Sequence, residues 1–291
     1  MKVRFWGVRG SIPSPGPDTV TYGGNTSCVQ LIFNEDKFLI FDCGSGIRAL
    51  GKNILTYSPE KKIKSNILLS HTHWDHIQGF PFFAPAFVTD NEFTIYGPPA
   101  INERLENVLA GQMEYRYFPV KLSDMSSNIK IKELNDNETI IDEIKIETKY
   151  MYHTSPTMGF KINHKGKTFL YCTDNEAHHI TPLDQKDYKN DFKENDWKFV
   201  EFVKNANLLI LDAQYTPEEY LKKIGWGHSN WKYAVQVAKE ADVKKLVLFH
   251  HDPEHNDKKL DKMLSDSSRY AEEIDYEGQI FLAQEEKVIE V

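Results

Sequence analysis

The sequence HTHWDH occupies residues 71–76 and places three imidazoles and one carboxylate within six positions, directly after an apolar run. His71 and His73 are two positions apart, so at the end of a strand their side chains point to the same side. Imidazole nitrogens and carboxylate oxygens are typical ligands of zinc and similar divalent ions. Packing Asp75 and His76 against the other two histidines without a metal would cost free energy through desolvation and repulsion. The segment therefore predicts a metal site.

The number of ligands in this segment favours two ions. A mononuclear catalytic site needs three protein ligands and a water, whereas HTHWDH alone offers four. Two ions about 3.5–4 Å apart would need further ligands from elsewhere in the chain. Polar residues follow apolar runs at His153, Asp174 and His250, and α/β folds place their chemistry at the ends of such strands. His251 directly follows His250, and alternation along a strand would send the two side chains to opposite sides.

Composition limits the classes of function. The chain has 291 residues, enough for one large domain or two small ones, and its net charge is −8. This charge disfavours broad binding to nucleic acid, although it allows a local positive site. The sequence has no run of about 18 apolar residues, so no membrane span is expected. The start MKVRFWGVRGS lacks the apolar segment of a secretory signal. Three cysteines, at positions 28, 43 and 172, are expected to be reduced core residues of a cytoplasmic protein.

The order of predicted elements indicates an α/β fold. The alternation of strands and helices is typical of sheets covered by helices, that is, a layered sandwich. The polar segment 181–205 predicts a lid or surface insertion. Strands are expected at residues 3–6, 28–33, 38–41, 64–70, 129–131, 140–148, 159–163, 168–173, 208–211 and 246–249, and helices at 102–110, from 216, after a Ser229 cap, and over 260–274.

HTHWDH followed by Gly79 resembles the H-x-H-x-D-H signature of the metallo-β-lactamase superfamily, and the resemblance covers nearly the whole chain. It implies a four-layered αββα sandwich and a single hydrolase domain over residues 1–291. Within the superfamily the chain looks most like the ribonuclease Z and cyclic-phosphodiester hydrolase branch. Four stretches carry this: FWGVRGSIPSPGPDTVTYGGNTSC, YHTSPTMGFKI, LYCTDNE and GWGHSNW.

The resemblance also implies a set of ligands for two divalent ions, zinc first and manganese or iron as alternatives. Aligning the strand LVLF with the family favours His250 over His251. Asp42, in FDCGSG, matches an aspartate that supports the ligand loop. The implied set has His71, His73 and His153 on one ion, Asp75, His76 and His250 on the other, and Asp174 bridging the two with a water or hydroxide.

By the same resemblance, the activated hydroxide attacks a phosphodiester. Asp75 and His228 are the expected catalytic residues, with His228 assisting the leaving group beside helix amides that face phosphate. Related lactam hydrolases commonly carry cysteine where this chain has Asp174, so the aspartate favours a phosphodiester or a thioester. The GHS segment around His228 then favours the phosphodiester.

The leading hypothesis is a phosphodiesterase that acts on a small anionic substrate such as a cyclic nucleotide. A ribonuclease Z-like endonuclease that processes RNA 3′ ends is the main alternative, followed by a thioester or lactone hydrolase and an inactive metal-binding regulatory protein. The stretch between His153 and Asp174 is too short for the transfer RNA-binding arm expected of ribonuclease Z. Members of the branch are often dimers, so a homodimer is expected by analogy only.

Overall fold

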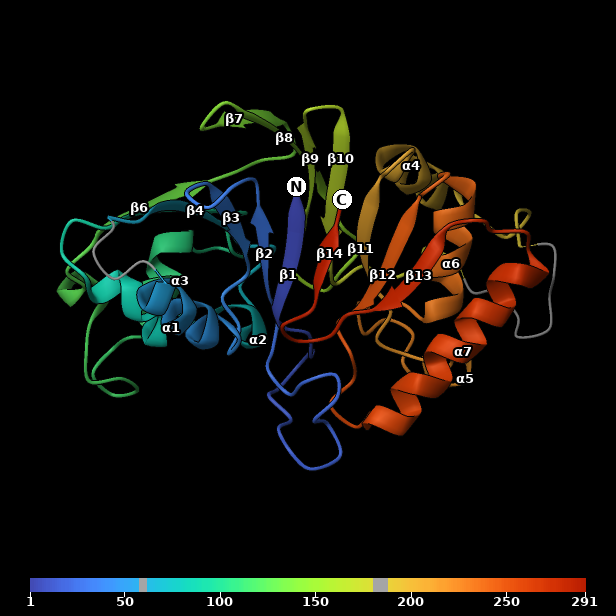
Figure 1. The fold of residues 1–291 in the computed structure, drawn as a ribbon, viewed down its shortest axis with the longest axis horizontal. Helices are drawn as coiled ribbons and strands as arrows, with labels where there is room; N and C mark the ends of the chain where they lie inside the picture. Colours follow the sequence, from blue (N-terminus) through green and yellow to red (C-terminus); the bar gives the residue numbers. More distant parts are fainter. Residues whose placement is uncertain (58–61, 180–187) are drawn as a thin grey trace. The chain divides into compact units, whose positions relative to one another are not determined.

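The computed structural model describes residues 1–57, 62–179 and 188–291. Its contacts divide the chain into two compact units. Unit 1 comprises Met1–Pro17, Tyr22–Asn135 and Gln284–Glu290, and unit 2 comprises Asp18–Thr21, Asp136–Ala283 and Val291. Each unit contains a seven-stranded mixed sheet flanked by helices, as Figure 1 shows. The prediction of a single domain stays a prediction.

The sheet of unit 1 has the order β14-β1-β2-β3-β4-β5-β6. Its first four strands pair antiparallel, and β3 to β6 pair parallel. Helices α1 and α3 contribute to the apolar core on one face (Figure 1). The elements are β1 (Lys2–Gly7), β2 (Cys28–Ile32), β3 (Phe38–Phe41), α1 (Ile47–Tyr57), β4 (Lys64–Leu68), α2 (Trp74–Ile77), β5 (Glu92–Gly97), α3 (Leu105–Gly111), β6 (Asn128–Glu133) and β14 (Val288–Glu290).

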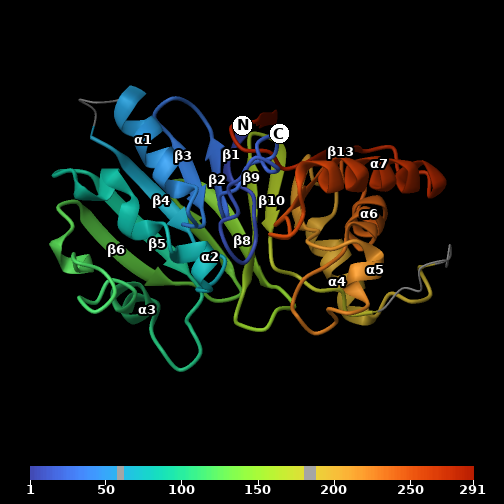
Figure 2. The same ribbon diagram turned by 90° about the horizontal axis from the view of Figure 1, so that it is seen from below.

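The sheet of unit 2 has the order β13-β12-β11-β10-β9-β8-β7, in which β10 to β13 pair parallel. Helix α6 packs on β11 and β12, and α7 packs on α6. Figure 2 shows α6 and α7 from a second direction. The elements are β7 (Glu138–Ile141), β8 (Ile144–Tyr150), β9 (Met158–His164), β10 (Lys167–Cys172), α4 (Glu194–Val203), β11 (Leu208–Asp212), α5 (Pro217–Tyr220), α6 (Trp231–Glu240), β12 (Lys245–Phe249), α7 (Asp257–Glu273) and β13 (Gln279–Leu282).

Most predicted strands are confirmed, and three local expectations are wrong. The stretch 140–148 is a hairpin and not one strand, because Asp142 and Glu143 form its turn with φ values of 47° and 67°. Helix α3 begins at Leu105 and not at residue 102. Asn230 and not Ser229 caps α6: the Asn230 side chain accepts the Tyr233 N–H, whereas the Ser229 hydroxyl donates to the Asn175 carbonyl.

The predicted lid at 181–205 lies partly outside the described residues, which exclude 180–187. The described remainder contains α4, which buries Phe199, Val200 and Val203 and packs against α6. The three cysteines are buried and free of disulfides, as expected. No helix among the described residues is long and apolar enough to span a membrane.

Three parallel strands of unit 2 end at one edge of their sheet. Cys172 of β10 pairs with Leu211 of β11, which pairs with Leu248 of β12. Asp174, Asp212 and His250 follow this row within two positions, so the shared register brings them to the same edge. In unit 1, HTHWDH follows the end of β4 in the same way.

The cap of α7 gives a test of the fold that lies apart from these strand ends. The Asn256 side chain accepts the Lys259 N–H at 2.9 Å. We expect Asn256→Ala to lower the free energy of unfolding by about 1 kcal/mol, because the first turn loses its acceptor. Urea unfolding followed by circular dichroism measures this. Asn256→Asp keeps the acceptor and should match the wild type, whereas an unchanged alanine variant would contradict the assignment.

Candidate metal centre

The HTHWDH segment forms one cluster of potential ligands in unit 1. His71 and His76 are fully buried and Asp75 is nearly so, whereas His73 is exposed. The His71 ring centroid lies 4.5 Å from that of His73 and 4.2 Å from that of His76. The Ser11 N–H donates to Asp75 Oδ2 at 2.7 Å, which fixes this carboxylate. The three imidazoles therefore lie close together with Asp75 beside His76, and their role as metal ligands stays a prediction.

Asp42 orients one imidazole of this cluster. Its buried carboxylate accepts the Ser70 N–H at 2.7 Å and the Ser70 hydroxyl at 2.9 Å. Asp42 Oδ2 lies 2.7 Å from His76 Nδ1. A neutral His76 therefore carries its proton on Nδ1, and this N–H donates a hydrogen bond to Asp42. His76 Nε2 is then the nitrogen that is available to a metal ion, and it lies 3.2 Å from Asp75 Oδ2. This is the supporting role predicted for Asp42.

A second cluster lies wholly within unit 2. Asp174, Asp212, His228 and His250 each offer one ligand atom, and these atoms lie within 4.8 Å of one another. The side chains are all buried. Asp174 and His250 adopt φ values of 51° and 65°, which turn the backbone sharply just after β10 and β12. Two carboxylates and two imidazoles at this spacing are suited to binding a divalent cation.

Two histidines of unit 2 direct the same nitrogen toward Asp174. His153 Nδ1 donates to the Gly227 carbonyl at 2.8 Å, and His153 Nε2 lies 3.7 Å from Asp174 Oδ2. His250 Nδ1 contacts Gln214 Oε1 at 3.0 Å, and its Nε2 lies 3.4 Å from Asp174 Oδ1. Burial lowers the pKa of His153, so its imidazole is neutral near pH 7 and its Nε2 lone pair is available.

His228 is held by a carboxylate that the sequence analysis did not single out. Its Nδ1 lies 2.8 Å from Asp212 Oδ2, and Asp212 Oδ1 accepts the Ser229 N–H at 2.8 Å. The His228 ring also stacks on His250, with centroids 4.8 Å apart. Asp212 ends an apolar strand, which is the signal that identified Asp174 and His250, so the same rule could have found it.

The structure separates the two candidates at the end of β12. His250 lies in the cluster with Asp174, whereas His251 Nε2 lies 2.9 Å from the Ala283 carbonyl. Three further residues of unit 2 contact the surroundings of these histidines and were missed, because no local pattern in the sequence marks them. They are Gln214, Glu176 and Gly227.

The donor set fits divalent metal ions. In His76, His153 and His250, Nδ1 is hydrogen-bonded to an oxygen acceptor while Nε2 faces a carboxylate. Metal-binding histidines show this arrangement, in which the acceptor fixes the tautomer and the ring orientation. The histidines and aspartates could therefore bind metal.

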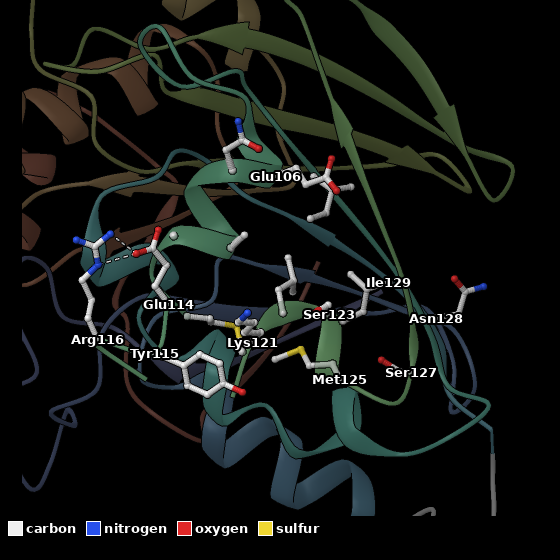
Figure 3. A pocket seen from close by; sticks show the side chains of 16 residues that line it. Glu106, Glu114, Tyr115, Arg116, Lys121, Ser123, Met125, Ser127, Asn128 and Ile129 are labelled. Atoms are coloured by element: carbon white, nitrogen blue, oxygen red, sulfur yellow. Dashed lines mark hydrogen bonds and ion pairs between the residues drawn. The ribbon is translucent and has the colours of Figure 1, made fainter. Parts of the chain in front are cut away.

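A cavity of about 950 Å³ opens elsewhere in unit 1, beside α3 and β6. Figure 3 shows Met125, Ile129 and Lys121 among the side chains that line this cavity, and the Arg116 side chain donates to Glu114. None of the predicted ligands is among its described lining residues, so this cavity is separate from both clusters.

Comparison with known proteins identifies the family. The model of the β-lactamase superfamily domain matches residues 38–251. The chain belongs to the metallo-β-lactamase superfamily. This confirms the resemblance stated from HTHWDH and the expected α/β fold.

Curated relatives are similar over most of the chain. Ribonuclease Z of Oceanobacillus iheyensis is 24% identical and covers 92% of this chain and 95% of its own length. Ribonuclease Z of Picrophilus torridus is 26% identical, with 89% of this chain and 88% of its own length covered.

Solved structures share the fold. The metallo-β-lactamase fold protein YhfI from Bacillus subtilis has a TM-score of 0.67 and 20% identity, covering 99% of both chains. The short form of human tRNase Z has a TM-score of 0.64 and 21% identity, covering 100% of this chain and 99% of its own. A diphosphatase of the PhnP family has a TM-score of 0.66 and 15% identity, with 100% and 97% covered.

Two glycines provide a matched test of the His153 geometry. Gly225 and Gly227 have φ values of 84° and 86°, so alanine is strained at both positions. A Cβ at Gly225 would meet open space, whereas one at Gly227 would overlap His153 Nδ1. We expect Gly227→Ala to weaken zinc binding about 10-fold or more while Gly225→Ala stays within about 3-fold of the wild type. Titration of metal-free protein against a chelating dye measures both, and equal affinities for the two variants would contradict this geometry.

Proposed function

We propose that this metallo-β-lactamase superfamily protein is a metal-dependent phosphodiesterase. The observation that carries the proposal is the cluster of unit 2, where Asp174 stands beside the bonded pair of Asp212 and His228. An aspartate among the ligands and a carboxylate-held histidine next to them suit a reaction in which a charged phosphodiester loses an alkoxide that needs a proton.

The proposed ligands are those predicted from the sequence. Family membership and the Nε2 orientation of three histidines support this set. Bound divalent ions would lower the pKa of water and offset the negative charge of the phosphoryl group. The set comprises His71, His73, Asp75, His76, His153, Asp174 and His250.

His228 is the proposed proton donor. Asp212 accepts the hydrogen bond from His228 Nδ1 and stabilises the imidazolium, so the second proton stands on Nε2. His228 is 9% exposed, which keeps competing water mostly away from the ring. In this proposal Nε2 donates its proton to the leaving oxygen as the bond to phosphorus breaks.

We propose a small phosphodiester, such as a cyclic nucleotide, as the substrate. The net charge of −8 disfavours extended contact with RNA. Residues 158–172 form the hairpin of β9 and β10 inside the sheet, which leaves no long arm between His153 and Asp174. A cytoplasmic location and a homodimer stay predictions.

RNA processing is a second candidate function. The comparisons support it as well as they support hydrolysis of a small phosphodiester. The curated relatives that match over most of their length are named Ribonuclease Z. For this chain, cleavage at the 3′ end of a precursor transfer RNA is therefore tested beside small substrates.

The substrate class is tested with metal-defined enzyme on a panel of 2′,3′- and 3′,5′-cyclic nucleotides, dinucleotides and precursor transfer RNA. We expect hydrolysis of a small phosphodiester with higher kcat/KM than cleavage of the RNA. His73→Ala should abolish hydrolysis, because it removes a proposed ligand. Preferential cleavage of precursor transfer RNA would reject the small-substrate proposal in favour of the second candidate.

The role of His228 is tested by varying the leaving group. With p-nitrophenolate, which leaves readily without a proton, we expect His228→Ala to reduce kcat only slightly. With an alkyl leaving group, we expect a reduction of about 100-fold, typical of a lost general acid. Asp212→Asn should follow the same pattern more weakly. Equal reductions with both leaving groups would contradict proton donation by His228.

A further inference from the structure

Glu176 places a carboxylate deep within unit 2, two residues after Asp174. The side chain is 4% exposed. One carboxylate oxygen accepts the Gly225 N–H at 2.7 Å, and the other accepts the Gly227 N–H at 2.8 Å. The Tyr220 hydroxyl donates a third hydrogen bond at 3.1 Å. These three donors offset the cost of burying the charge.

The backbone that Glu176 binds has an unusual shape. Gly225 and Gly227 both adopt left-handed φ values on either side of Trp226. Such φ values are readily accessible to glycine. Within this turn the Trp226 N–H donates to the Lys223 carbonyl at 3.1 Å, whereas the N–H groups of the two glycines point to Glu176. The Glu176 carboxylate supplies acceptors for both glycine N–H groups, so it selects this conformation of the loop over others.

The loop in turn determines the orientation of His153. The Gly227 carbonyl accepts the hydrogen bond from His153 Nδ1 at 2.8 Å. A carbonyl can only accept, so this bond requires the proton on Nδ1 and leaves the Nε2 lone pair facing Asp174. The Glu176 N–H also donates to the Tyr152 carbonyl at 2.8 Å, which anchors the residue before His153.

We propose that Glu176 is a positioning residue that fixes the tautomer and direction of His153 through the glycine loop 225–227. Its carboxylate binds the Gly227 N–H, and the Gly227 carbonyl binds His153 Nδ1, so the peptide groups on the two sides of Gly227 transmit the constraint. The same loop leads directly into His228, which Asp212 holds. The relevance of this positioning to catalysis rests on the proposed function, whereas the tautomer itself does not.

Glu176→Gln is the most selective substitution. Glutamine has the same shape, but one of its two terminal groups is an NH2 donor, which opposes the N–H of Gly225 or Gly227. Nitrogen-15 NMR of the imidazoles in full-length, metal-free protein at pH 8 reports which nitrogen carries the proton, and His153→Gln assigns the signal. We expect the wild type to show a single Nδ1–H tautomer of His153. In Glu176→Gln we expect a mixture of tautomers and a zinc affinity about 10-fold lower.

Two control variants separate positioning from general damage. Glu219→Gln alters a carboxylate of the same unit that accepts the Thr216 N–H at 2.8 Å, and it should leave the His153 signal unchanged. Tyr220→Phe removes only the third donor to Glu176, so the glycine bonds and the tautomer should persist. If Glu176→Gln does not fold, Glu176→Asp serves instead, because the shorter side chain cannot reach both N–H groups.

An unchanged His153 tautomer and zinc affinity in a folded Glu176 variant would overturn the proposal. A tautomer change shared by Glu219→Gln would do so as well, because it would show a nonspecific effect. If no phosphodiester is hydrolysed by the wild type, the proposed function fails while the NMR comparison still decides the role of Glu176.

Discussion

A buried neutral histidine can offer only one ring nitrogen to a metal ion. The hydrogen-bond acceptor beside the other nitrogen keeps the proton there, and so determines which nitrogen is available to the metal. Here Asp42, Gln214 and the Gly227 carbonyl contact Nδ1 of three histidines, and each leaves Nε2 facing a carboxylate. These acceptors lie on loops that follow strands or connect short helices. The ends of the strands and helices therefore determine where the acceptors lie. Metal binding in this account depends on such contacts as much as on the ligands themselves.

Burial of the acidic groups explains the density of hydrogen bonds around the clusters. An ionised carboxylate inside a protein costs free energy unless donors surround it. Asp212 receives the Ser229 N–H and the His228 ring, and Glu176 receives two glycine N–H groups and a tyrosine hydroxyl. The tyrosine hydroxyl comes from helix α5, and the other donors come from the loop between α5 and α6, whose Gly227 carbonyl contacts the proposed ligand His153. The interactions that stabilise the charges therefore also define the geometry of the site.

Much of the candidate site could be predicted from the sequence, because its residues end apolar strands or lie in HTHWDH. Asp212 also ends an apolar strand, but it was not among the predicted site residues. Glu176 and Gly227 could not be found this way, since their contacts join segments that are distant in sequence. The strands were recovered from their apolar runs, whereas the 140–148 hairpin was missed because its Asp-Glu turn contains neither glycine nor asparagine. Ser229 and Asn230 are both good caps, and the bond from Ser229 to Asn175 decides between them.

The central claim is that metal ions bound by these histidines and aspartates support phosphodiester hydrolysis. The most direct measurement removes all metal with a chelator, adds zinc or manganese back stepwise, and follows bound ions per chain together with hydrolysis of bis(p-nitrophenyl) phosphate. The account predicts no hydrolysis without metal and recovery that is complete when two ions are bound. Hydrolysis that persists in the metal-free protein, or a chain that binds no ion, would contradict it.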